Sequence, residues 1–210
     1  MKRTISTWIR LLGLAGLLAG CAAPAPTRHY SLAAPAAQQP VAGVARMAAA
    51  GGLLLSVTRI PAEAERPQLV VHDPARDPAV QVLNDSLWAA PLGGQIRDAL
   101  ASGVARRLGT ADLRRLTDAG ERPVRRIEVR IDRFDMVWGR FVALDADWMD
   151  RLPGADRTRL CRASVRLPAA EGVAALVDAQ RLALDHLAAI IAGAPDGLQG
   201  QPRVAESGCT

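Results

Sequence analysis

Aromatic residues are scarce in this chain of 210 residues, in which four tryptophans, two phenylalanines and one tyrosine make up 3%. Leucine, valine, isoleucine and alanine must therefore build any core, and apolar residues do make up half of the chain. Lysine occurs once, at Lys2, so the positive charge comes almost entirely from arginine. Without a basic stripe interleaved with aromatic residues, the sequence argues against binding to nucleic acid.

Patterns of metal-binding and catalytic residues are also missing. The three histidines, His29, His72 and His186, lie far apart and lack metal-ligand spacing, so we expect no metal and no cofactor. Asp185 precedes His186, but no Gly-x-Ser-x-Gly elbow accompanies this pair. Because adjacent helical residues point about 100° apart, we expect the pair to lie on a solvated helix face. The sequence therefore predicts a protein without catalytic residues.

The Gly93-Gly94 pair lies at the start of an apolar helical pattern. It resembles a phosphate-binding loop only faintly, because the Lys-Ser/Thr element of a P-loop does not follow it. We interpret these glycines as a turn that allows close packing.

The N-terminus has the three parts of a bacterial lipoprotein leader. A positive start at Lys2-Arg3 precedes an apolar run from Leu11 to Leu18, which is too short to span a bilayer as a stable helix. The run ends in Leu18-Ala19-Gly20-Cys21, the pattern of a lipobox. We therefore predict a signal peptide over residues 1–20 and lipid attachment at Cys21. An ordinary secretory signal with a chance cysteine is the alternative, and a retained transmembrane anchor is less favoured.

The residue after the predicted lipid attachment site bears on location. Ala22 stands where an aspartate would favour retention in the inner membrane of enteric bacteria, so we expect an outer-membrane lipoprotein that faces the periplasm. Three basic residues, Lys2, Arg3 and Arg10, lie in the predicted leader, which leaves 23 basic and 21 acidic residues in the mature chain. The high formal charge of +5 is therefore partly a property of the leader.

Composition divides the mature chain into three parts. Residues 21–52 are rich in alanine, proline, glutamine and glycine, and predict a lipidated N-terminus and a flexible tether with a short strand near residues 29–32. Fully extended at ~3.3 Å per residue, such a tether would reach roughly 100 Å. Residues 53–193 form the predicted domain, and residues 194–210 a C-terminal tail.

Alternating and helical periodicities predict the elements of this domain. Strands are expected over 53–60, 68–72 and 80–83, and over a meander of 127–138, 142–148 and 161–167. Within the meander the apolar positions change phase after Ile131, which predicts a bulge near Arg133. Helices are expected over 92–108, ended by Gly109, and over 172–192, ended by Gly193. The expected fold is α+β, with a mainly antiparallel sheet of about five to seven strands and two helices on one face.

Two cysteines remain once Cys21 is lipidated. In an oxidising periplasm we predict that Cys161 and Cys209 form a disulfide, and the alternative is a buried Cys161 with a free thiol in the tail. The tryptophans Trp88 and Trp148 are candidates for partner anchors. A core role is favoured for both, because each lies on the apolar phase of its element.

Several segments together resemble the PqiC-like family of ABC-type transport auxiliary lipoproteins. In order along the chain they are Tyr30-Ser31-Leu32, Val57-Thr58-Arg59-Ile60-Pro61, Arg66-Pro67-Gln68-Leu69-Val70, Leu87-Trp88-Ala89-Ala90-Pro91-Leu92, the strand pair from Phe134 to Trp148, and the Ala-Leu-rich terminal helix. The resemblance covers residues 29–193. Two positions depart from the family, which usually has an acidic residue at position 90 and often an arginine at position 87.

The resemblance implies a non-enzymatic subunit of an MCE-type intermembrane lipid transport system, which docks the transport conduit at the outer membrane and supports membrane integrity. Its implied partners are a periplasmic MCE-domain protein and an inner-membrane transport component, and a homo-oligomer remains open. Trp88, Pro91 and Leu92 are the motif residues expected to contact a partner or to belong to the core. The alternatives are a structural lipoprotein that scaffolds another envelope complex and, more weakly, a lipoprotein hydrolase.

Overall fold

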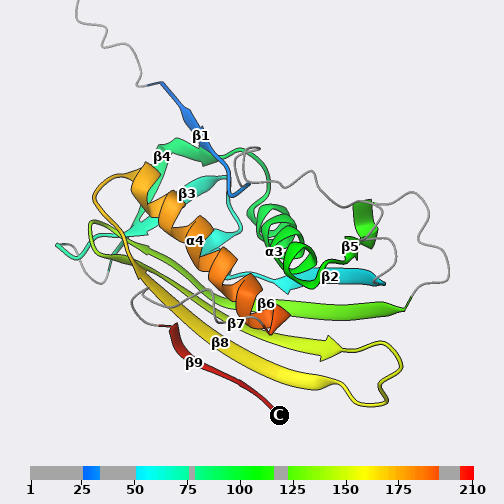
Figure 1. Ribbon diagram of the computed structural model, residues 1–210. Helices are drawn as coiled ribbons and strands as arrows, with labels where there is room; N and C mark the ends of the chain where they lie inside the picture. Colours follow the sequence, from blue (N-terminus) through cyan, green and yellow to red (C-terminus); the bar gives the residue numbers. More distant parts are fainter. Residues whose placement is uncertain (1–25, 34–50, 76–78, 116–122, 194–203) are drawn as a thin grey trace, which may run out of the picture.

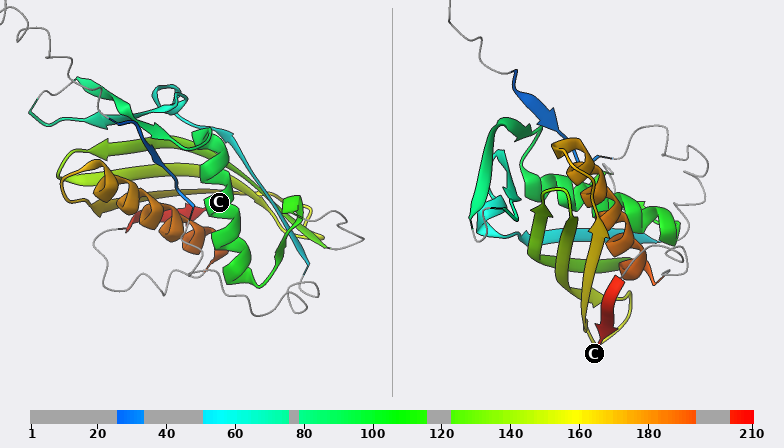
Figure 2. Two further views of the ribbon diagram at one scale, coloured as in Figure 1. Left: turned by 90° about the horizontal axis from the view of Figure 1, so that it is seen from above. Right: turned by 90° about the vertical axis from the view of Figure 1, so that its left-hand side faces the viewer.

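The computed structural model describes residues 26–33, 51–75, 79–115, 123–193 and 204–210, and both helices lie on the same face of one sheet (Figure 1, Figure 2). The predicted α+β class with two helices on one face of a mostly antiparallel sheet is confirmed. The strands are β1 (Arg28–Tyr30), β2 (Gly52–Arg59), β3 (Gln68–His72), β4 (Val80–Trp88), β5 (Ala111–Asp112), β6 (Val124–Val137), β7 (Phe141–Arg151), β8 (Arg159–Pro168) and β9 (Val204–Cys209). The helices are α3 (Leu92–Leu108) and α4 (Val173–Ala192), with short 3₁₀ helices at Ala62–Ala64 and Leu113–Arg115.

The sheet forks at β6. Its main strand order is β1-β4-β3-β6-β7-β8-β9. Strand β2 also pairs with β6, along the same side of β6 as β3. Strand β2 runs parallel to the first half of β6, from Gly52 opposite Val124 onward, whereas β3 meets β6 only at His72 opposite Val137. The region between the end of β2 and the start of β3 is therefore an opening in the sheet.

The longest strand, β6, contains the predicted bulge. Its pairing with β7 shifts register between Ile131 and Arg133. Before the shift Ile127, Val129 and Ile131 are buried, and after it Phe134 and Met136 are buried. The bulge thus keeps apolar side chains on the core face along both halves of one strand.

The two helices pack against each other and cover the sheet (Figure 2). They approach closely where a Cβ built on Gly103 would lie 2.7 Å from the Cβ of Ala188, so this position of α3 accepts only glycine. Gly109 and Gly193 end the helices in the left-handed conformation, as predicted. Within the described residues, neither helix is long and apolar enough to cross a membrane.

The C-terminal residues add a strand that the sequence did not predict. Strand β9 pairs antiparallel with β8, and the predicted disulfide between Cys161 and Cys209 is present in the structure. Thr210 continues this pairing through two backbone hydrogen bonds with Leu160. The expectation of a tail over residues 194–210 was therefore wrong for its last part, while residues 194–203 lie outside the described residues.

Two further expectations need correction. The described residues form nine strands, more than the expected five to seven, because β5 and β9 are short additions at the edges. Strand β4 extends to Trp88 and does not end at Leu83, because its last residues pair with β1. The polar residues between Leu83 and Leu87 fall at a register shift in the pairing of β3 with β4.

Candidate functional site

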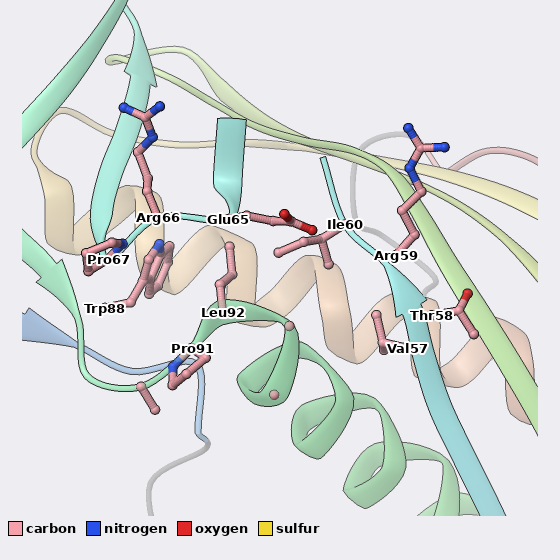
Figure 3. A pocket seen from close by; sticks show the side chains of 13 residues that line it. Val57, Thr58, Arg59, Ile60, Glu65, Arg66, Pro67, Trp88, Pro91 and Leu92 are labelled. Carbon is pink, nitrogen blue, oxygen red and sulfur yellow. The ribbon is translucent and has the colours of Figure 1, made fainter. Parts of the chain in front are cut away.

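A cleft of about 530 Å³ opens at the fork of the sheet, between the end of β2, the end of β4 and the first turn of α3 (Figure 3). Ile60, Trp88 and Leu92 lie at its base, and each is at least nine-tenths buried. Arg59 and Arg66 lie on opposite sides of the opening, and their side chains point the same way (Figure 3). The cleft therefore combines an apolar floor with a charged rim.

Local backbone structure holds the walls of the cleft. Strand β2 ends before Pro61, whose carbonyl accepts a hydrogen bond from the N–H of Ala64 and begins a 3₁₀ helix. The chain then returns through Pro67, whose carbonyl accepts the N–H of Trp88 at 2.7 Å. The indole of Trp88 packs edge-to-face on Phe134, with ring centroids 6.3 Å apart. The two segments that line the cleft are thus fixed to each other and to β6.

Gly93 and Gly94 form the first turn of α3 at the cleft. A Cβ built on Gly93 would approach only Ile60, at 3.9 Å, and one on Gly94 would meet nothing within 4 Å. Our expectation that these glycines allow close packing was therefore wrong. Glycine is about 1 kcal/mol less favourable than alanine in a helix, and no contact of the described fold requires it here. The glycines leave the first turn of α3 open toward the cleft.

Residues 28–32, here named the strap, begin with β1, which pairs with the end of β4 that lines the cleft. Tyr30 pairs with Trp88 in β4, and the Tyr30 carbonyl accepts the N–H of Ala89 at 2.8 Å. Leu32 is buried, and its N–H donates to Oε1 of Gln95 at 2.8 Å. The same Gln95 amide donates to the carbonyl of Ala90 at 2.8 Å, so one side chain of α3 joins the strap to the end of β4.

The strap is also held by the second helix. Nε of Arg181 in α4 donates to the carbonyl of Ser31 at 2.8 Å, and its terminal nitrogen donates to the same oxygen. Only residues 22–27 separate Cys21 from β1. Even fully extended, this stretch spans at most about 25 Å. The expected reach of roughly 100 Å was therefore wrong, because the strap fixes the chain to the domain soon after Cys21.

The structure places the predicted site residues as follows. All three motif residues line the cleft; Trp88 and Leu92 belong to the buried core, whereas Pro91 is exposed and occupies the N-cap position of α3. Trp148 is buried opposite Cys161, away from the residues that line the cleft. Cys21 lies outside the described residues.

Sequence reasoning did not identify Gln95 or Ile60 as parts of this region. The segment from Val57 to Pro61 was noticed only for its resemblance, although its apolar end forms one wall. A glutamine within the apolar stripe of α3 was the one available hint for the contact with the strap, which joins residues 63 positions apart.

Asp185 lies at the contact of the two helices and His186 is buried, so the pair does not share a solvated face. His186 is 3% exposed, and burial lowers the pKa of its imidazole below the usual range. Asp185 accepts two hydrogen bonds from Arg107 and one from Arg106, both in α3. Burial alone would raise the pKa of Asp185, but the Arg107 hydrogen bonds and charge outweigh burial and lower it. Asp185 therefore joins α3 to α4.

No group of three histidine, cysteine or acidic side chains that could hold a metal ion occurs within the described residues. The chemistry gathered at the cleft is therefore that of an apolar surface, two guanidinium groups and the Glu65 carboxylate.

Comparison with known proteins gives the family of the chain. Two solved structures share the fold. An uncharacterized protein has a TM-score of 0.59 at 17% identity, over 80% of this chain and 98% of its own. Protein XCC0632 from Xanthomonas campestris, described with the family model DUF330, has a TM-score of 0.50 at 16% identity, over 71% and 89%. No curated protein matches the sequence. The model of the ABC-type transport auxiliary lipoprotein component matches residues 30–192, and the chain therefore belongs to this family.

Proposed function

We propose that this protein is the outer-membrane subunit of an MCE-type intermembrane lipid transport system, where it docks the transport conduit without catalysing a reaction. The family supports a role beside an ABC-type transporter. The strap is the observation that carries the proposal further. Because the chain joins the domain at Arg28, a lipid on Cys21 would hold the domain within about 25 Å of the membrane surface. Such a short connection suits a fixed docking subunit.

The strap also supports an orientation in which one end of the domain faces away from the membrane. The hairpin between β7 and β8 lies at the end of the sheet opposite β1 (Figure 1). In β6, Arg126 pairs with Arg151 at the base of this hairpin, and Val137 pairs with His72 of β3. These two positions of β6 are about 36 Å apart along the strand. With the strap at the membrane, the hairpin points toward the periplasm.

The hairpin end carries exposed apolar side chains. Leu160 is 57% exposed, Met149 pairs with it across the strands at 43%, and Leu152 follows at 39%. Arg151 and Arg157 flank these residues and are exposed. Exposed apolar groups rimmed by polar residues are typical of protein contact sites. We assign this end to the contact with the MCE-domain partner.

Crosslinking in envelope membranes, with the native acyl anchor present, tests the proposal. Purification of the crosslinked lipoprotein is expected to recover an MCE-domain protein, and Leu160→Asp is expected to reduce that recovery at least tenfold. Leu182→Asp is the control, because Leu182 is likewise an exposed leucine, at 39%, but lies on α4. Repeated recovery of a different envelope complex, or of no partner, would overturn the proposed function.

A further inference from the structure

The cleft at the fork contains charged and apolar groups that take no part in the proposed docking of the conduit at the hairpin. Its rim carries Arg59 and Arg66, both exposed and without an ion pair or hydrogen bond within the described residues. Elsewhere on the described surface many arginines are paired, as Arg130 and Arg162 are with Asp147. The two guanidinium groups at the cleft are therefore available to an anionic ligand.

The floor below these arginines is apolar. Ile60, Trp88 and Leu92 form it, and the volume of about 530 Å³ lies within the usual range of small-molecule sites. Glu65 at the same rim leaves a net charge of +1, which matches a single phosphodiester. A ligand with one anionic group and an attached apolar chain would satisfy both parts of the cleft.

The connection to Cys21 indicates where such a ligand would come from. The strap pairs with Ser86 to Trp88, so the cleft shares Trp88 with the strand that receives the chain from Cys21. If Cys21 carries lipid, as proposed above, the cleft lies beside the surface of the anchoring membrane. Phospholipids are then the anionic, apolar molecules nearest to it.

We propose that the cleft binds a glycerophospholipid of the anchoring membrane. The phosphate lies at the charged rim, where Arg59 and Arg66 are exposed, and the first part of an acyl chain lies on the floor formed by Ile60, Trp88 and Leu92. Gly94 leaves open space beside this path, where a side chain would otherwise stand. The inference rests on the lipid anchor of the proposed function, but not on the identity of the protein partner.

Native mass spectrometry of the full lipidated chain, released from detergent in the presence of 1-palmitoyl-2-oleoyl-phosphatidylglycerol, tests this assignment. The expected result is a 1:1 adduct. Gly94→Leu fills the open space and removes a glycine from a helix, so it is expected to fold stably and to lower adduct formation at least tenfold. The double variant Arg59→Gln and Arg66→Gln is expected to lose the adduct as well.

The matched control is the double variant Arg151→Gln and Arg157→Gln, which removes the same charge at the hairpin and is expected to retain the adduct. Equal adduct formation by wild type, Gly94→Leu and the Arg59/Arg66 variant would overturn the lipid site. A second result would also overturn the lipid site: neither wild type nor any variant binds lipid, and the Arg59/Arg66 variant no longer captures the MCE-domain protein. The cleft would then bind an acidic peptide of that protein. Loss of partner capture by Leu160→Asp with the lipid adduct retained would separate the two proposals.

Discussion

Among the contacts that hold the strap, those of Gln95 can be removed without altering the sheet. Gln95 receives the N–H of Leu32 and donates to the carbonyl of Ala90, and it is 9% exposed. In Gln95→Leu a side chain of similar size keeps the apolar packing of α3 but removes both hydrogen bonds. We expect the strap to detach locally while the sheet and the two helices remain folded.

The magnitude follows from the surroundings of the two partners. Leu32 is 2% exposed, so its N–H would lose its acceptor without gaining water, whereas Ala90 is exposed and its carbonyl can be hydrated. An orphaned buried donor costs about 1–3 kcal/mol, and we expect about 2 kcal/mol here. This value corresponds to an increase of roughly 30-fold in the population of the detached strap.

Hydrogen exchange of the Ala89 amide measures this population, because that N–H donates to the Tyr30 carbonyl in the strap. Gln180→Leu is the matched control. Gln180 is a fully buried glutamine on α4 whose amide donates to the carbonyl of Asp135 in β6. The control is expected to lower the global free energy of unfolding. The difference between the opening free energy of the Ala89 amide and the global free energy is expected to stay unchanged. Equal exchange rates of the Ala89 amide in wild type and Gln95→Leu would refute the inference that the Gln95 hydrogen bonds hold the strap on the domain.

Three further results are expected from stability measurements. Burial lowers the pKa of His186 from its ordinary 6.5, so the unfolded state takes up a proton at a higher pH than the folded state. The urea midpoint is therefore expected to fall as the pH drops below about 6.5. A midpoint that stays constant between pH 7.5 and 5.5 would contradict this. Replacing Cys161 and Cys209 by serine opens a loop with a sequence separation of 48 and is expected to cost about 4 kcal/mol in urea unfolding, and less than 1 kcal/mol would show that β9 adds little constraint. Asp150→Asn leaves the Arg125 guanidinium, 14% exposed, without its carboxylate, and is expected to lower the unfolding free energy by about 3 kcal/mol in the same assay. An unchanged unfolding free energy would contradict this.

Regular elements were predictable where one periodicity extends over many residues. In α3 the apolar residues recur every four positions, and the structure buries Leu92, Ile96, Leu100 and Val104. The phase change in β6 was equally clear, because a strand with one buried face reveals a bulge as a shift in alternation. The disulfide followed from the even number of cysteines left after the lipobox.

The cleft and the strap were not predictable, because each joins short segments that lie far apart along the chain. The cleft needs the end of β2 beside the start of α3, roughly 30 residues later, and no pattern in either segment indicates the other. Strand β9 has little apolar alternation, and it is held by backbone pairing and by Cys209. The burial of His186 was not predicted, because it depends on tertiary packing that the residue's position beside Asp185 does not reveal.

The orientation of the domain at the membrane can be measured most directly by site-specific photocrosslinking in cells. A probe replaces Leu160 at the hairpin in one variant and Pro67 at the rim of the cleft in another, both in the lipidated full chain. We predict that the probe at position 160 captures an MCE-domain protein and that the probe at position 67 captures phospholipid. Capture of the MCE-domain protein from position 67, with phospholipid captured from position 160, would contradict a docking subunit held at the membrane by its strap.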